Sequence, residues 1–183
     1  MPSKTDEPLL AETIAERRRL ACLLADLTPQ QWDTASLCTG WRVREVVAHM
    51  TMPFRTSPPQ FIAGLAKARF SFNRYADKAA RRDASAMSHE RLLASLRDNA
   101  ANPWRPPGGG QAGALSHDVI HGLDITAPLG LPSPPAERIA LVLSHGGPKN
   151  LKYFGVDLQG DRLVATDADL ELGDPGGRPR RSR

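Results

Sequence analysis

The sequence predicts a mainly α-helical protein: a bundle of helices joined by loops and followed by a short extension that contains strands. Two observations support this fold class. Apolar residues recur every three to four positions through most of the chain up to Ser144, which is the period of an amphipathic helix. Patterns typical of strands begin only at Gly155. With 183 residues, the chain is also long enough to bury one core of ordinary size.

The first three helices are expected within residues 9–53. Apolar spacing predicts an amphipathic helix over about residues 9–27, with the aliphatic stem of Arg17 on its apolar face. Thr28-Pro29-Gln30-Gln31 offers a capping hydroxyl, a proline at the first helical position and a glutamine at the third, which predicts a new short helix. The stripe from Val43 to Met50 predicts a third helix, which Pro53 ends or kinks.

The next helices follow clear start signals. Pro58-Pro59 opens a long helix that we expect to run to about Ala80, with six inward residues: Phe61, Ile62, Leu65, Ala68, Phe72 and Tyr75. Ser88 is expected to cap a helix over residues 88–99. Residues 102–111 read as a loop, and helices are expected over about residues 112–127 and 135–144.

The composition argues against a membrane-spanning or secreted protein. No stretch approaches the about 20 apolar residues that cross a bilayer, and the N-terminus lacks the apolar core of a secretory signal. The two cysteines, Cys22 and Cys38, are too few for a disulfide framework, so we expect a cytoplasmic protein with free thiols. The net charge is +4, but four arginines lie in the last six residues, and removing them leaves residues 1–177 at zero.

The histidines suggest a metal site. His117 and His121 are four residues apart on an expected helix, so both imidazoles lie on one face and can bind one ion. His49, from the helix with the valine stripe, would complete a three-nitrogen set. Asp118 and Asp124 are placed to accept hydrogen bonds from the imidazole N–H groups. The alternative is that these histidines are simply packed or solvated, which is the reading we give to His89 and His145.

Two motifs resemble a known family. The segment Ser36–Met50 contains the pattern W-x-V-x-[DE]-[VL]-[VL]-x-H, and His117–Gly130 fits a ligand-x-x-x-H-x-x-D-x-x-x-x-L-G pattern. In this order and at this separation they resemble the mycothiol-dependent maleylpyruvate isomerase family, a relative of the DinB superfamily. The resemblance covers roughly residues 9–172.

The resemblance implies a DinB-like four-helix bundle that holds one divalent ion through His49, His117 and His121. Zn²⁺ is the default ion, although Ni²⁺ and Fe²⁺ also accept three imidazoles. It further implies mycothiol, a low-molecular-weight thiol, as co-substrate, together with a small-molecule substrate. Bundles of this type often pair through a helix face, which leaves a homodimer open.

The sequence departs from the family at three places. The isomerases carry a glutamate where this chain has His117, so the expected ligand set is three histidines, as in the wider DinB group. Arg42 replaces the usual Ser/Thr cap, so the capping box with Glu45 is expected to be lost, at about 1 kcal/mol. The C-terminal domain of longer members is reduced to two expected strands, Gly155–Leu158 and Arg162–Thr166.

We therefore expect three segments: a metal-binding bundle over residues 1–150, a short β-containing remnant of a C-terminal domain over 151–174, and a disordered arginine-rich tail over 175–183. The leading functional hypothesis is a metal-dependent transferase or isomerase that adds a thiol to a small electrophile. One alternative is a non-catalytic metal-binding module. The other is a partner-binding protein that uses the basic tail, with nucleic acid disfavoured by the uncharged body.

Overall fold

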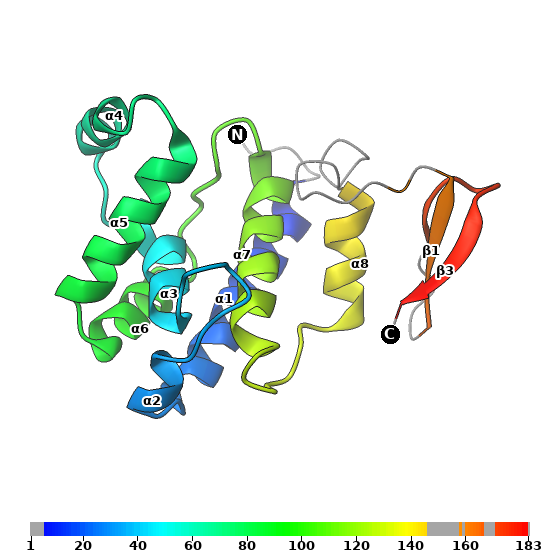
Figure 1. The fold of residues 1–183 in the computed structure, drawn as a ribbon, viewed down its shortest axis with the longest axis horizontal. Helices are drawn as coiled ribbons and strands as arrows, with labels where there is room; N and C mark the ends of the chain where they lie inside the picture. The colour runs from blue at the N-terminus through cyan, green and yellow to red at the C-terminus, as the bar shows by residue number, and fades with distance from the viewer. Residues whose placement is uncertain (1–5, 146–157, 159, 167–170, 183) are drawn as a thin grey trace. The chain divides into compact units, whose positions relative to one another are not determined.

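The computed structural model describes residues 6–145, 158, 160–166 and 171–182, and its fold is mainly helical (Figure 1). The predicted fold class, helices followed by a short strand-containing extension, is confirmed. The chain divides into two compact units, Met1–Ser133 and Pro134–Arg183. Among the described residues, no helix combines the length and apolar character needed to cross a bilayer.

The first unit is a helical bundle. Its helices are α1 (Asp6–Ala25), α2 (Pro29–Trp32), α3 (Val43–Thr51), the 3-10 helix η1 (Met52–Phe54), α4 (Pro58–Lys67), α5 (Phe72–Ala86), α6 (His89–Asp98) and α7 (Gly110–Thr126). Helix α1 packs along α6 and α7, and α3 packs against α5, α6 and α7. The core between them is aliphatic, and its fully buried members include Leu20, Val43, Val46, Val47, Leu92 and Ile125. Burying each such side chain contributes about 1.5–3 kcal/mol.

The predicted helix starts are confirmed at two capping residues. Thr28 caps α2 by accepting a hydrogen bond from the Gln31 backbone N–H, and the Gln31 side chain accepts from the Thr28 N–H in return. Ser88 caps α6 by accepting from the Arg91 N–H. Because α6 begins at this cap, its buried Leu92 and Leu96 face the core.

The long helix expected from Pro58 to Ala80 was wrong. The chain breaks after Lys67 into α4 and α5, because Arg69 and Phe70 adopt left-handed backbone angles, with φ of 54° and 56°. Ser71 then caps α5 by accepting from the Arg74 N–H. Ser71 is therefore the residue in the sequence that marks the start of a separate helix. The predicted inward positions of Ile62 and Phe72 were wrong for the same reason, since both side chains are exposed.

The second unit contains α8 (Ala136–His145) and a three-stranded sheet of β1 (Asp161–Ala165), β2 (Glu171–Gly173) and β3 (Arg178–Ser182). The strand order is β2-β1-β3, with β1 antiparallel to β2 and parallel to β3. The tail therefore differs from the expected disordered segment. Its backbone pairs with β1, and Arg180 forms an ion pair with Asp161 at 2.7 Å.

Two further expectations for this unit fall largely outside the described residues. Of the strand expected at residues 155–158, only Leu158 is described, and it does not lie in a strand. The boundary expected at residue 150 also lies in an undescribed stretch, so the division into a bundle over 1–150 and a remnant over 151–174 stays a prediction.

Candidate metal centre

The structure brings the three predicted histidines together from two packed helices. His117 and His121 lie one turn apart on α7, with ring centroids 4.8 Å apart. His49 lies near the end of α3, and its ring centroid is 5.2 Å from that of His117 and 4.9 Å from that of His121. The apolar stripe of α3 packs α3 into the core and so carries His49 to α7.

The spacing of the ring nitrogens fits a metal ion. The Nε2 atoms of His49 and His117 are 3.3 Å apart. A tetrahedral ion with metal–nitrogen bonds of about 2.0–2.1 Å separates two of its nitrogen ligands by about 3.3 Å. One ligand atom from each of the three histidines lies within 4.8 Å of the others. Three imidazoles are a donor set that Zn²⁺, Ni²⁺ and Fe²⁺ accept.

Both histidines of α7 are oriented by a carboxylate. The Asp118 carboxylate accepts from His117 Nδ1 at 2.9 Å, and the Asp124 carboxylate accepts from His121 Nδ1 at 2.9 Å. A proton on Nδ1 leaves the lone pair on Nε2, which is the tautomer that binds a metal. Asp118 and Asp124 are therefore in the positions expected from the sequence, one beside each histidine.

Burial favours the uncharged imidazole, the form that binds a metal, at two of the three histidines, His49 and His121. Burial first, and then the neighbouring His117 and His121, lower the pKa of His49 from its ordinary value to about 2. The pKa of His121 is also lowered, mainly by burial, although its hydrogen bond to Asp124 opposes the shift. His49 Nδ1 is buried and has no hydrogen-bond partner among the described residues, so no carboxylate orients this ring.

A buried arginine holds Asp118, a contact that the sequence does not predict. Arg17 of α1 is 1 % exposed, and its Nε donates to Asp118 Oδ2 at 2.6 Å. Its Nη1 donates to the Asn102 carbonyl oxygen at 2.6 Å, and its guanidinium lies over the Phe54 ring, 5.1 Å from the ring centre. We expected only the aliphatic stem of Arg17 to be buried. No local pattern links two residues 101 positions apart.

Asp124 is held by neutral donors from the loop before α3. The Cys38 thiol donates to Asp124 Oδ2 at 3.0 Å, and the Leu37 N–H donates to the Asp124 carbonyl oxygen at 3.0 Å. Burial, then the hydrogen bond to Asp124, raise the pKa of Cys38 to about 12, so the group is a thiol at neutral pH. Cys38 Sγ is 3.8 Å from His121 Nδ1. That contact is with the ring nitrogen opposite Nε2, so Cys38 does not supply a fourth ligand on the Nε2 side.

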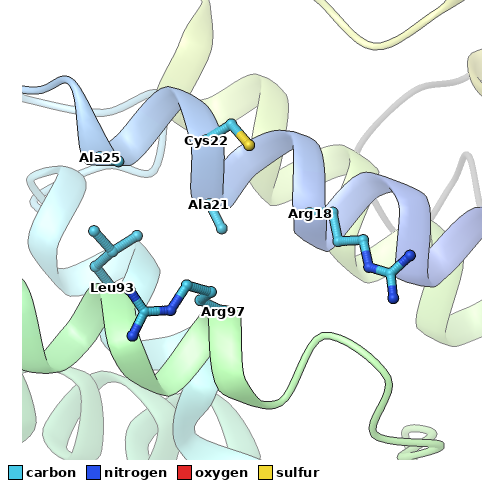
Figure 2. A pocket seen from close by; sticks show the side chains of 6 residues that line it. All are labelled: Arg18, Ala21, Cys22, Ala25, Leu93 and Arg97. Carbon is cyan, nitrogen blue, oxygen red and sulfur yellow. The ribbon is translucent and has the colours of Figure 1, made fainter.

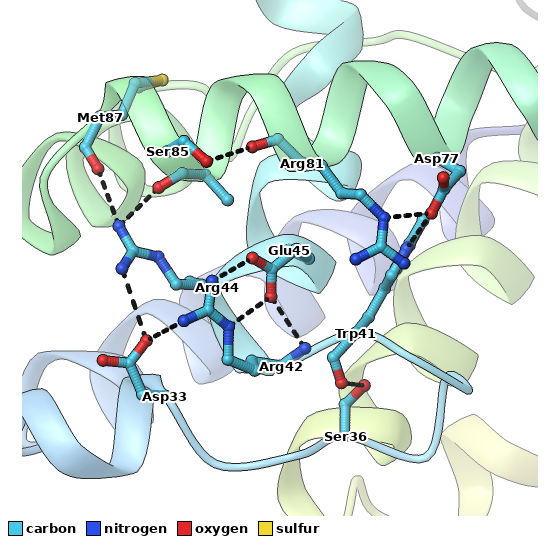
Figure 3. A network of polar contacts seen from close by, with 11 residues as sticks. Asp33, Ser36, Trp41, Arg42, Arg44, Glu45, Asp77, Arg81, Ser85 and Met87 are labelled. Carbon is cyan, nitrogen blue, oxygen red and sulfur yellow. Dashed lines mark hydrogen bonds and ion pairs between the residues drawn. The ribbon is translucent and has the colours of Figure 1, made fainter.

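Two indole rings flank the histidines. The Trp41 ring centre is 5.3 Å from that of His49, and the Trp104 ring centre is 5.6 Å from that of His117. Trp41 donates from Nε1 to Asp77 of α5 at 2.8 Å, which fixes the indole at the start of α3 (Figure 3). Trp104 lies in the loop before α7, where no local sequence pattern marks it as part of the site. Both rings are half-buried and cover part of the centre.

The start of α3 is stabilised differently from the sequence expectation. Glu45 accepts from the Arg42 backbone N–H at 2.8 Å and pairs with the Arg42 guanidinium at 2.6 Å (Figure 3). Burial alone would raise the pKa of Glu45, but these hydrogen bonds hold it below its ordinary value. Arginine has no acceptor atom, so only one half of the capping box is lost. The expected loss of the whole box was wrong.

A hollow of about 340 Å³ lies between α1 and α6 (Figure 2), and no histidine lines it. Its walls are mainly apolar, and it is lined by Arg18, Ala21, Cys22, Ala25, Leu93 and Arg97. None of the predicted site residues contributes to it. The other two histidines have separate environments, since His89 stacks on Trp32 at 5.0 Å and His145 is exposed on α8.

Comparison with protein families identifies the bundle. A family described as the mycothiol maleylpyruvate isomerase N-terminal domain matches residues 14–125. The match covers more than half of the chain and includes the three histidines, the two carboxylates that orient them, and Cys38. No curated protein and no solved structure matches the chain.

Proposed function

Because the chain belongs to the mycothiol maleylpyruvate isomerase N-terminal domain family, we propose that it is a metal-dependent enzyme that uses a low-molecular-weight thiol, mycothiol, to modify or isomerise a small electrophilic molecule. The observation that carries the proposal is the set of three converging imidazoles, His49, His117 and His121, two of them oriented by buried or half-buried carboxylates. A divalent ion held there would supply Lewis acidity, which lowers the pKa of a thiol and makes it nucleophilic at neutral pH.

The protein's own residues prepare the centre in three ways. Asp118 and Asp124 hold the protons on Nδ1 of His117 and His121, so both Nε2 atoms keep a free lone pair. Trp41 and Trp104 cover two sides of the centre and limit its contact with water. All three proposed ligands are uncharged, so the full charge of the ion would be available to stabilise an anionic sulfur.

The first experiment measures the metal content of protein purified without a histidine tag. We expect about one ion per chain, with Zn²⁺ as the default, because three imidazoles form a single site. The double variant His117→Ala/His121→Ala is expected to lose the ion. The matched control His145→Ala removes an exposed histidine of α8 and should keep it.

The second experiment separates the enzyme from the non-catalytic alternative. Protein loaded with Co²⁺ is titrated with mycothiol, and visible absorption is followed. A new sulfur-to-cobalt band, together with either consumption of the thiol or isomerisation of an added electrophile, supports the proposed function. A bound ion without either response would leave a metal-binding module. No bound ion in the parent protein, even after titration with Zn²⁺ and Ni²⁺, would refute the metal centre. The cytoplasmic location expected from the sequence, and the homodimer that the resemblance leaves open, need separate measurements.

A further inference from the structure

Helix α4 and its turn into α5 form a surface that is apolar on the outside as well as on the inside. The inward side is formed by Phe61 and Leu65, which pack against the cluster around Tyr75. Outward, Ile62 is 64 % exposed, Phe70 is 77 % exposed and Phe72 is 48 % exposed. These three are among the four large apolar side chains that are exposed in the described part of the chain. We call Ile62, Phe70 and Phe72 the α4–α5 patch.

The backbone holds Phe70 outward at a conformational cost. Arg69 and Phe70 have φ of 54° and 56°, a left-handed conformation that is an outlier for a bulky residue. The turn is fixed by backbone hydrogen bonds from Arg69 N to Ala66 O and from Phe70 N to Leu65 O, each 2.9 Å. Burial within the unit does not offset this cost, because the Phe70 ring is largely exposed. A strained turn that exposes an aromatic ring indicates an interaction outside the fold.

The surroundings of the patch are basic. Lys67, Arg69 and Arg74 lie beside its apolar residues in sequence, and all three side chains are exposed. No aspartate or glutamate occurs between Arg55 and Asp77. The patch is therefore bordered by positive charge without local neutralisation in the sequence, although residues 1–177 have no net charge as a whole. A binding partner that matches the patch in charge and polarity would be an anionic surface that also accepts apolar side chains.

We propose that the α4–α5 patch docks onto an anionic lipid surface. Aromatic and aliphatic side chains flanked by lysine and arginine are the composition that binds the boundary between lipid headgroups and acyl chains. A symmetric pair of chains joined through this face would bring together two basic surfaces, each carrying Lys67, Arg69 and Arg74, so the charge disfavours self-association. The patch lies on a helix and a turn at one end of α5 (Figure 1), a projecting shape that inserts into a deformable surface.

The test uses the full-length chain and flotation with lipid vesicles. Vesicles that contain phosphatidylglycerol are expected to bind at least about tenfold more protein than vesicles of phosphatidylcholine alone, and added salt should weaken the binding. The triple variant Ile62→Ser/Phe70→Ser/Phe72→Ser should lose binding, and so should Lys67→Ala/Arg69→Ala/Arg74→Ala. A matched control, Arg81→Ala/Arg82→Ala/Arg97→Ala, removes three exposed arginines elsewhere and should bind normally. Circular dichroism checks that each variant is folded.

A second readout locates the contact. In Phe70→Trp the new indole should shift its fluorescence to the blue with anionic vesicles and not with neutral ones, relative to the parent protein. Equal binding by the patch variants and the control, or no binding by the parent, would overturn the proposal. Sedimentation of a dimer that the triple serine variant converts to a monomer would also overturn it and assign the face to a second copy. These outcomes do not depend on the metal centre.

Discussion

His117 and His121 occupy successive turns of the same helix and donate to carboxylates at the same distance of 2.9 Å, yet their carboxylates are held in different ways. Asp118 pairs with the guanidinium of Arg17, and both side chains are almost fully buried. Asp124 is half-buried and accepts from the thiol of Cys38. His117 is therefore oriented by a carboxylate that pairs with a buried cation. His121 is oriented by a carboxylate that neutral donors hold.

Because Asp118 and Asp124 are held differently, changes at the two carboxylates should differ in their effect on the free energy of unfolding. A buried ion pair contributes little net stability, but removing one partner leaves an uncompensated charge that costs far more. The hydrogen bond from the Cys38 thiol to Asp124 has a smaller asymmetry, because the Asp124 side chain is 17 % exposed and water can replace the donor. We therefore expect changes around His117 to affect folding of the whole bundle, and changes around His121 to affect mainly the metal.

The largest effect is expected from Arg17→Met. This change leaves Asp118 as a buried carboxylate without its cation, and it should lower the free energy of unfolding by about 3–5 kcal/mol. Urea denaturation of the metal-free protein measures it. Arg82→Met is the control, because Arg82 is 68 % exposed and its removal should cost less than about 0.5 kcal/mol. Equal losses in the two variants would show that the Arg17–Asp118 pair does not differ from a surface pair.

The next comparison is Asp118→Asn against Asp124→Asn. Each should weaken metal binding by about 10–100-fold, because each removes the anion that fixes a ligand tautomer. Only Asp118→Asn should also destabilise the bundle, by about 3 kcal/mol or more, since it leaves the Arg17 cation buried without an anion. Competition with a chromophoric chelator gives the affinity, and urea denaturation gives the stability. Equal losses of stability in the two variants would contradict the expectation that only Asp118 is needed for folding.

The pH dependence of the metal-free protein follows from the lowered pKa values. His49, whose pKa is about 2, stays neutral in the folded state below pH 6.5, whereas the unfolded chain binds a proton there, and the lowered pKa of His121 acts in the same direction. Stability should thus be unaffected by these groups above about pH 6.5 and should fall below it, by up to about 1.4 kcal/mol per pH unit for His49, with a further loss from His121. Urea denaturation from pH 5 to 8 measures the slope, and His49→Gln should reduce it. A flat profile would contradict the burial of neutral histidines.

The sequence predicted the bundle and the histidines because both have local signatures. The apolar stripe of α3, the caps at Thr28 and Ser88, and the one-turn spacing of His117 and His121 can each be identified within a few residues. Arg17 could not be found in this way, since its partner Asp118 lies on a different helix.

At the break between α4 and α5, a local pattern is present but predicts the wrong structure. The apolar pattern of residues 58–80 continues through Arg69 and Phe70, so periodicity alone predicts one helix. Helix α4 is apolar on both sides, because Phe61 and Leu65 pack inward while Ile62 faces outward. A period of three to four residues cannot tell two apolar faces from one broad face, so the exposure of Ile62 was not foreseen.

The smallest effect is expected at Cys38. Cys38→Ala removes the thiol donor from Asp124, but the backbone hydrogen bond from Leu37 to the Asp124 carbonyl keeps the loop in place, so metal affinity should fall by less than about tenfold. Cys38→Ser restores a donor and should recover the parent affinity, whereas a purely space-filling role would leave the serine variant as weak as alanine. Cys22→Ala, which removes the exposed cysteine of α1, is the control. A loss of 100-fold or more in Cys38→Ala would mean that the sulfur binds the metal directly, and that the loop before α3 belongs to the ligand set.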